Sequence, residues 1–209
     1  MLVIAVEHPV DRPEMDWWFG RCDPPGNRIL ADTIQRLCDW IPEAFGIRTF
    51  HLPYHVERGG IYLKDTAVVA GLGCIGRNNL LVTREYGPRV RLRALTLDVD
   101  LPSTGPLPST GPLGFDPCEG CDAPCLRACP RGAFDRRVYG PAKVGPNVGP
   151  GQLPGRTGHF SRAACNIQME ADIENAVEQP GGGGDDCMKI VKYCRACELS
   201  CPVGSAERL

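Results

Sequence analysis

Seven of the twelve cysteines in this chain lie in two short runs with the spacing of metal-ligating cysteines. The runs are Cys118-x2-Cys121-x3-Cys125-x3-Cys129-Pro130 and Cys194-x2-Cys197-x3-Cys201-Pro202. A loop with a cysteine every three or four residues can wrap three thiolates around one iron–sulfur cubane, while the cysteine before the proline reaches a second cluster. The spacing therefore predicts two [4Fe–4S] clusters per chain.

The second run holds only three cysteines, so its cluster requires a thiolate from elsewhere. Cys165 lies in a stretch that predicts a helix capped by Ser161, whereas Cys187 follows the glycine run 181–184. Zinc is the alternative metal, but zinc sites usually pair two Cys-x2-Cys units well apart. One residue more than usual separates Cys121 from Cys125, so we expect a bulge in that loop.

Composition limits the class of protein and its partners. Lysine and arginine number 23 and the acidic residues 25, so the net charge of −2 does not suggest DNA binding. No apolar run approaches the ~18 residues of a membrane span, and the apolar N-terminal stretch is shorter than that of a signal peptide. A disulfide scaffold would be shorter and denser in cysteine. We expect a cytoplasmic protein with no DNA or membrane partner.

Glycine and proline concentrate in three segments that divide the chain. Residues 101–112 repeat the hexamer Leu-Pro-Ser-Thr-Gly-Pro twice, which is typical of an extended linker. We therefore expect one domain over residues 1–100, a linker over 101–114 and a second domain over 115–209. Flexible inserts are expected at 140–158 and 180–186.

The first domain shows the patterns of strands and helices. Apolar runs or alternation predict strands over residues 2–6, 47–52, 80–83 and 89–96. Helical spacing predicts a helix over 28–41, capped by Asn27 and ended by Pro42, and a shorter helix over 64–70. Arg89, Arg91 and Arg93 share one face of the last strand. This face is either solvated or a docking surface for an acidic electron-transfer partner or for the polar side chains of a corrinoid.

The segment between the short helix and the next strand matches the residue pattern of a nucleotide-binding motif but lacks the structural context of that motif. Gly71, Gly73 and Gly76 form Gly-x-Gly-x-x-Gly, but no long helix follows, as dinucleotide binding requires. Three glycines in six residues would let a large flat cofactor approach the backbone. We therefore expect a cofactor-binding stretch, whose candidate residues are Gly71, Gly73, Gly76, Arg77, Asn78 and Asn79.

Residues 64–102 resemble a signature of the epoxyqueuosine reductase family. The similarity lies in Ala70-Gly-Leu-Gly-Cys-Ile-Gly-Arg-Asn-Asn79, in Glu85-Tyr-Gly87 and in a strand that reaches Asp100-Leu-Pro102. A paired-cluster ferredoxin module follows in that family, as it does here. Corrinoid-dependent reductive dehalogenases are similar in the same stretch.

The resemblance implies an α+β fold: a truncated nitroreductase-like, cobalamin-binding-type α/β domain followed by a double [4Fe–4S] ferredoxin-like domain. It implies cobalamin as a further cofactor. Carried over, the first cluster is bound by Cys118, Cys121, Cys125 and Cys201, and the second by Cys129, Cys165, Cys194 and Cys197.

The chain also departs from the family pattern. Only 70 residues precede Gly71, fewer than in the family's reductases. An ungapped alignment places Glu57 where the family has its proton-donating aspartate, although the flanking residues differ. Arg77 and Cys74 stand where the family has lysine and tryptophan.

The leading interpretation is an iron–sulfur redox protein that passes single electrons to a corrinoid cofactor or a corrinoid protein. No protein nucleophile or acid–base pair is evident, so the chemistry would belong to the cofactors. Two other classes stay open. One is a reductase that acts on epoxyqueuosine in tRNA, and the other is a plain ferredoxin-type carrier with a redox partner protein.

Overall fold

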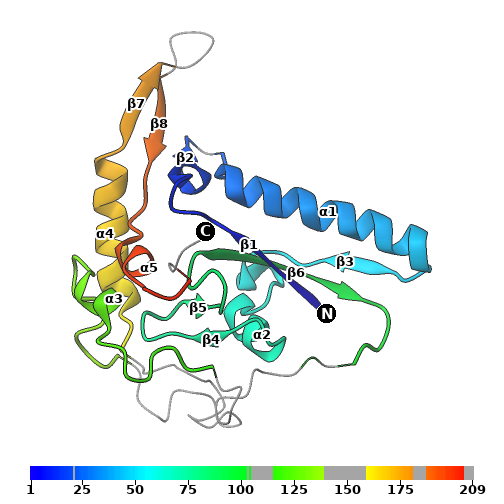
Figure 1. Ribbon diagram of the computed structural model, residues 1–209. Helices are drawn as coiled ribbons and strands as arrows, with labels where there is room; N and C mark the ends of the chain where they lie inside the picture. Colours follow the sequence, from blue (N-terminus) through cyan, green and yellow to red (C-terminus); the bar gives the residue numbers. More distant parts are fainter. Residues whose placement is uncertain (21, 103, 105–114, 139–158, 181–186, 205–209) are drawn as a thin grey trace.

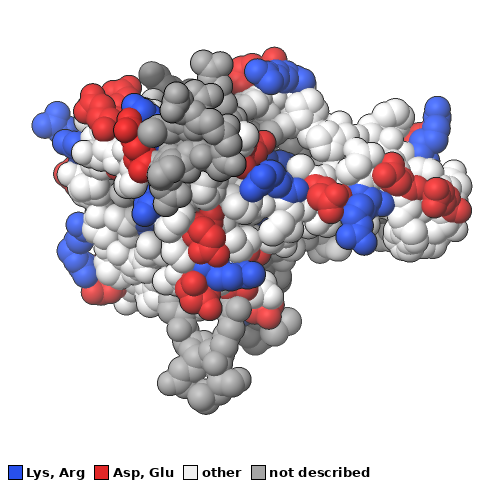
Figure 2. All heavy atoms as spheres, turned by 90° about the horizontal axis from the view of Figure 1, so that it is seen from above, with Lys and Arg blue, Asp and Glu red and all other residues white. Residues whose placement is uncertain are grey.

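The structure is a computed structural model that describes residues 1–20, 22–102, 104, 115–138, 159–180 and 187–204 (Figure 1). The expected linker at 101–114 and the expected inserts at 140–158 and 180–186 fall almost entirely outside the described residues. No helix among the described residues is long and apolar enough to cross a membrane. On the face shown in Figure 2, acidic and basic side chains are interspersed.

A three-stranded antiparallel sheet lies at the centre of the N-terminal half, with the order β1 (Leu2–Glu7), β6 (Val90–Leu97), β3 (Thr49–His51). Helix α1 (Pro25–Phe45) covers one face and helix α2 (Leu63–Val69) the other (Figure 1). Side chains alternate between the faces of a strand. Leu2 and Ile4 therefore pack towards α1, whereas Val3 and Ala5 pack towards α2.

Helix α1 is longer than the sequence predicts at both ends. It begins at Pro25 and not after Asn27, because a proline in the first turn lacks only an N–H that has no helical partner there. It also continues through Pro42 to Gly46, where φ is 68°. Pro42 cannot donate to the carbonyl of Cys38, and the hydroxyl of Thr49 donates to that carbonyl instead, at 2.9 Å.

Three short strand pairings were not predicted from the sequence. Strands β4 (Cys74–Ile75) and β5 (Leu81–Val82) form a hairpin beside α2. Strands β7 (Val177–Pro180) and β8 (Cys187–Val191) form a ribbon, and β2 (Trp18–Phe19) pairs with β8. The second sheet, ordered β2-β8-β7, therefore joins segments from both ends of the chain.

The remaining described elements are short, apart from one helix. They are the 3-10 helices η1 (Pro13–Asp16) and η2 (Val56–Arg58) and the helices α3 (Pro124–Arg127), α4 (Arg162–Glu174) and α5 (Ala196–Leu199). The predicted helix around Cys165 is α4, and Ser161 caps it by accepting a hydrogen bond from the amide of Ala164 at 3.2 Å. The predicted strands and the shorter helix of the first domain are confirmed with small shifts in their ends.

Candidate metal centre

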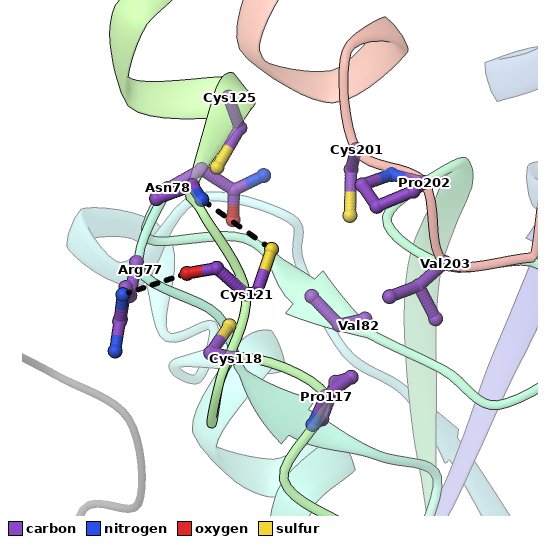
Figure 3. A pocket seen from close by; sticks show the side chains of 11 residues that line it. Arg77, Asn78, Val82, Pro117, Cys118, Cys121, Cys125, Cys201, Pro202 and Val203 are labelled. Carbon is purple, nitrogen blue, oxygen red and sulfur yellow. Dashed lines mark hydrogen bonds between the residues drawn. The ribbon is translucent and has the colours of Figure 1, made fainter.

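Four cysteines from both runs gather around one pocket, where the loop at 117–125 meets the segment 201–203 (Figure 3). Cys118, Cys121 and Cys125 come from the first run, and Cys201 comes from the second. Burial raises the pKa of Cys125, and the nearby thiols of Cys201, Cys118 and Cys121 raise it further. We refer to these four residues as the first group.

The other four candidate ligands also influence one another. Burial raises the pKa of Cys197 to about 12, and its neighbours Cys194, Glu198, Cys129 and Cys165 contribute to the increase. Cys165 on α4 likewise interacts with Cys129 and Cys194. We refer to Cys129, Cys165, Cys194 and Cys197 as the second group. Nothing is described of the Cys187 side chain, the rival candidate for this group.

The chemistry of both groups fits an iron–sulfur cluster. Crowded, buried thiols resist ionisation, whereas a bound metal ion removes the proton outright. Among the described residues, no three Cys, His, Asp or Glu side chains are close enough to share one metal ion. A cubane binds each of its four thiolates through a different iron, so its ligands lie farther apart than those of a single ion.

Backbone amides already point at two of the sulfurs. The amide of Ala123 donates to the sulfur of Cys121 at 3.4 Å, and the amide of Ala133 donates to that of Cys129 at 3.3 Å. Hydrogen bonds of this kind help to set the potential of a cluster. Ala123 adopts a left-handed conformation, with φ of 53°, directly before Pro124. This unusual backbone lies where the sequence predicts a bulge.

The three glycines of the signature serve the chain itself. Gly71 has φ of 79° and ends α2 in a Schellman motif: its amide bonds to the carbonyl of Val68, and the amide of Leu72 to that of Ala67. A Cβ atom on Gly73 would clash with the carbonyl of Val82 on β5. The glycine pattern predicts an open space for a cofactor beside Gly73, but the backbone of the hairpin fills that space.

The tip of the hairpin reaches both cysteine loops. The guanidinium of Arg77 donates to the backbone carbonyl of Cys121 at 3.3 Å. The side-chain amide of Asn78 donates to the backbone carbonyl of Cys197 at 3.2 Å. Asn78 is only 2% exposed, and Asn79 turns the chain with φ of 59°. The candidate cofactor-binding residues Arg77 and Asn78 therefore contact one loop of each group.

The Glu-Tyr-Gly part of the signature packs against the segment that follows Cys201. A Cβ atom on Gly87 would overlap the carbonyl of Val203, and one on Gly204 would overlap the backbone of Tyr86 and Gly87. Only glycine permits so close an approach of two backbones. No local sequence pattern predicts this contact, because the residues that form it are more than a hundred positions apart.

Arg89, which precedes β6, and Arg91 and Arg93, which lie on it, form neither a solvated face nor a free docking surface. That expectation is wrong. Arg89 is 3% exposed and donates to the carbonyls of Cys201 and Val203. Arg91 pairs with Asp16 and Glu198. Arg93 is buried, with its guanidinium 4.3 Å from the centre of the Tyr54 ring. Tertiary contacts bury Arg89 and Arg93 and leave Arg91 only 27% exposed.

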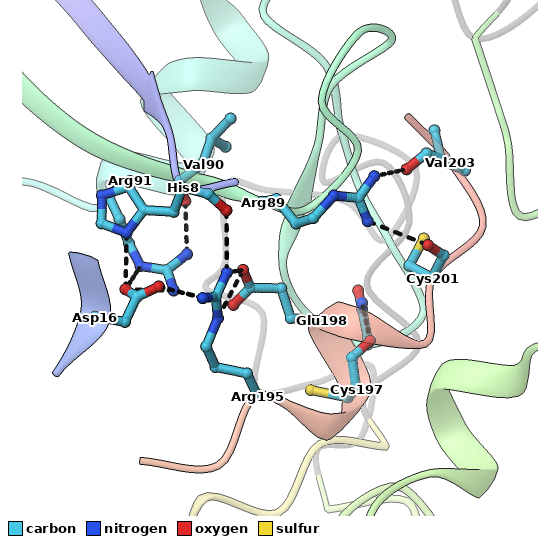
Figure 4. A network of polar contacts seen from close by, with 11 residues as sticks. His8, Asp16, Arg89, Val90, Arg91, Arg195, Cys197, Glu198, Cys201 and Val203 are labelled. Carbon is cyan, nitrogen blue, oxygen red and sulfur yellow. Dashed lines mark hydrogen bonds and ion pairs between the residues drawn. The ribbon is translucent and has the colours of Figure 1, made fainter. Parts of the chain in front are cut away.

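A buried ionic network attaches the second cysteine run to the N-terminal half (Figure 4). Asp16 lies between His8, Arg91 and Arg195, and Glu198 pairs with both arginines. Burial by itself would raise the pKa of Asp16, but the hydrogen bond with His8 and the charge of Arg91 lower it. The network therefore favours an ionised Asp16.

Two further residues singled out by the sequence lie in contrasting surroundings. Glu57 lies on η2 with an exposed side chain. Cys74 lies on β4, where burial raises its pKa to about 12 and where Cys118, Asp116 and Cys201 contribute to the shift. Cys74 is therefore a neighbour of the first group.

The mixed α/β fold and the two cysteine groups define an α/β protein with a candidate iron–sulfur centre, and the comparisons with known proteins are more specific. The chain is 32% identical to the epoxyqueuosine reductase of Pseudomonas aeruginosa over 178 residues, which cover 81% of this chain and 41% of the relative. It is 33% identical to that of Gloeobacter violaceus over 109 residues, or 52% of this chain and 31% of the relative. No protein-family model matches.

Solved structures agree in fold. The epoxyqueuosine reductase of Streptococcus thermophilus superimposes with a TM-score of 0.55 and 21% identity, over 98% of this chain and 49% of the other. An epoxyqueuosine reductase solved with an epoxyqueuosine-modified tRNA stem loop gives a TM-score of 0.58 at 19% identity, over 99% of this chain and 49% of the other. The resemblance to epoxyqueuosine reductases expected from the sequence is confirmed.

The comparisons also correct the leading interpretation. The similar curated proteins are reductases and not electron carriers for a corrinoid or a corrinoid protein, so that expectation is wrong. They favour the alternative, an enzyme that acts on tRNA. The chain spans only about 40% of the Pseudomonas relative and about half of the solved structures.

Proposed function

We propose that this chain is an iron–sulfur oxidoreductase of the epoxyqueuosine reductase type, with epoxyqueuosine in tRNA as its substrate. The observation that carries the proposal is the gathering of eight cysteines into two groups of four beside the hairpin of the family signature. The names of the relatives supply the substrate.

We further propose two domains with the boundaries expected from the sequence. Residues 1–100 form a nitroreductase-like domain, 101–114 a linker, and 115–209 a ferredoxin-like domain with two [4Fe–4S] clusters. The pairing of β2 with β8 and the ionic network around Asp16 support a fixed arrangement of the two. A fixed arrangement suits electron transfer because it holds the clusters at a constant distance from the reacting group.

Removal of an epoxide oxygen consumes two electrons and two protons and releases water. The eight cysteines would hold the clusters that supply the electrons, and Arg77 and Asn78 would hold the cluster loops against the hairpin. Glu57 is the proposed proton donor, and its exposed position leaves it open to substrate.

Cobalamin is the further cofactor that the resemblance implies, but the residues assigned to it from the sequence do not form a cradle for it. The space beside Gly73 is filled by β5, and that beside Gly76 by Val82 and Asn78. Arg77 and Asn78 bind the cysteine loops. We therefore derive no step of the reaction through a corrinoid.

The test is turnover by the reconstituted chain. The protein is loaded with iron and sulfide without oxygen and is mixed with a chemical reductant and an epoxyqueuosine-modified tRNA stem loop, with and without cobalamin. Digestion and mass spectrometry should show conversion of epoxyqueuosine to queuosine, and a Cys197→Ser variant should convert none. Loaded wild-type protein that leaves the epoxide intact in both mixtures would refute the proposal.

A further inference from the structure

Arg89 is a buried cation whose hydrogen bonds, among the described residues, run to two backbone carbonyls. Its side chain is 3% exposed, and it donates to the carbonyl of Cys201 at 3.2 Å and to that of Val203 at 2.6 Å. Within the described part of the chain, no carboxylate lies at ion-pair distance from it. Two neutral carbonyls do not balance a full charge, and a buried charge without a counter-ion is strongly unfavourable. The position of Arg89 therefore suggests an anion that the described residues, taken without a bound group, do not supply.

The neighbouring arginines show the contrast (Figure 4). Arg91 and Arg195 share the two carboxylates of Asp16 and Glu198, so these four charges balance. Arg89 points away from that network, towards Cys201 and Val203. Cys201 belongs to the first group, and the charge of Arg89 favours its thiolate even though burial raises the pKa of this thiol overall. The first group in its metal-bound form is thus an anionic site beside Arg89.

We propose that Arg89 is the counter-ion of the first cluster and raises its reduction potential above that of the second. The proposal rests on the cluster assignment made above, but not on the tRNA substrate. Four thiolates on a [4Fe–4S] core carry a net negative charge, which grows when the cluster accepts one electron. A buried cation nearby stabilises the reduced form more than the oxidised form, because the Coulomb attraction increases with the charge.

Among the described residues beside the second group, no arginine is buried without a carboxylate partner, and the carboxylate of Asp172 accepts from the amide of Cys194 at 2.7 Å. Its contact with the signature hairpin is the neutral amide of Asn78, at the carbonyl of Cys197. The nearby charge of Glu198 is balanced by Arg91 and Arg195, and Arg162 beside Cys165 is exposed, so water screens it. The two clusters therefore differ in the charge buried beside them, and the first should be reduced before the second.

The test is a redox titration of the reconstituted protein, with dithionite as the reductant and electron paramagnetic resonance as the readout. Arg89→Gln keeps an N–H donor for the carbonyls and removes the charge. Arg89→Gln should lower one of the two reduction potentials and leave the other unchanged. Arg89→Lys keeps the charge and should therefore keep that potential close to the wild-type value. Arg93→Gln is the matched control. Arg93 lies on β6, which Arg89 directly precedes, and is also buried, but among the described residues it contacts no cluster ligand. Arg93→Gln should change neither potential.

Iron analysis separates the outcomes. If wild-type protein binds no iron, the cluster assignment fails and this proposal fails with it. If the clusters load and Arg89→Gln leaves both potentials unchanged, only the counter-ion role of Arg89 is refuted. Loss of one cluster in Arg89→Gln, with retention in Arg89→Lys, supports a role of the charge. Equal loss in both variants refutes it, because the shape of arginine and not its charge would then be required.

Discussion

The side-chain amide of Asn78 donates to the carbonyl oxygen of Cys197 across 3.2 Å, although 119 positions separate the two residues. The neighbouring Arg77 makes the equivalent contact with Cys121 in the first run. The tip of one β-hairpin thus holds both cysteine loops. This contact gives a physical reason for a signature that includes polar residues after its last glycine.

Asn78→Ala should destabilise the protein by about 1–3 kcal/mol, because loss of this buried side chain leaves the carbonyl of Cys197 without its donor and the amide of Leu80 without its acceptor. It should also hasten cluster loss in the presence of a chelator. The measurements are denaturant unfolding and the decay of the visible absorption. Asn175→Ala is the control, since its exposed amide bonds only within its own helix. If both variants unfold and lose iron alike, the Asn78 contact does not hold the loop.

Anaerobic reconstitution should give about eight irons per chain, four for each cluster. The two groups of four thiols are the reason for this expectation. Iron and acid-labile sulfide are measured on the desalted protein. A content near half of this value, or zinc in place of iron, would contradict the assignment of two clusters.

Cys165→Ser should lose or convert one cluster, because Cys165 lies on the ordered helix α4 beside Cys129 and Cys194. Cys187→Ser should retain both, since ordering the glycine run before Cys187 would cost ~1–2 kcal/mol per residue. Iron content and the resonance spectrum of the reduced protein distinguish the two variants. The opposite result would make Cys187 the ligand.

Gly73→Ala should destabilise the protein more than Gly46→Ala. A methyl group at Gly73 meets the backbone of Val82, and such overpacking costs about 1–3 kcal/mol or more. At Gly46 the space is open, and only the left-handed backbone, at φ of 68°, opposes a side chain, by roughly 1–2 kcal/mol. Thermal unfolding of the two variants compares these costs. Equal stability would mean that the hairpin shifts to accept the methyl group.

Asp16→Asn should cost about 3 kcal/mol near neutral pH, because it leaves Arg91 and Arg195 with one carboxylate between them. The pKa of Asp16 is lowered in the folded protein, so its contribution is complete above the ordinary aspartate value of about 3.9. The difference between wild type and variant should shrink as the pH falls below that value, towards the folded pKa. Denaturant unfolding of the cluster-free chain at several pH values measures it.

Asp98→Asn is the matched control for Asp16→Asn. Asp98 pairs with Arg48 at the surface, where both side chains are at least half exposed. Such a pair contributes at most about 1 kcal/mol. If the two substitutions cost the same, the network around Asp16 contributes no more than a surface ion pair.

Much of the fold was predictable because its signals are local. Alternation and helical spacing predicted most elements of the sheet domain, and Ser161 marked the start of α4. Strand β5 was predicted, but its partner β4 was not, because a two-residue strand carries no periodicity. The pairing of β2 with β8 was missed because its partners come from opposite ends of the chain.

The sequence by itself predicts the metal chemistry, since ligand spacing within a loop is a property of a dozen neighbouring residues. Only the tertiary structure decided what Gly73 and Arg89 do. The same glycine pattern suits a cofactor cradle or a tight hairpin, and the backbone of Val82 makes it the hairpin. An arginine on an alternating strand faces water unless another segment covers it, and the segment after Cys201 covers Arg89. Such contacts depend on how segments that are distant in the sequence pack together, and the spacing of neighbouring residues does not predict that packing.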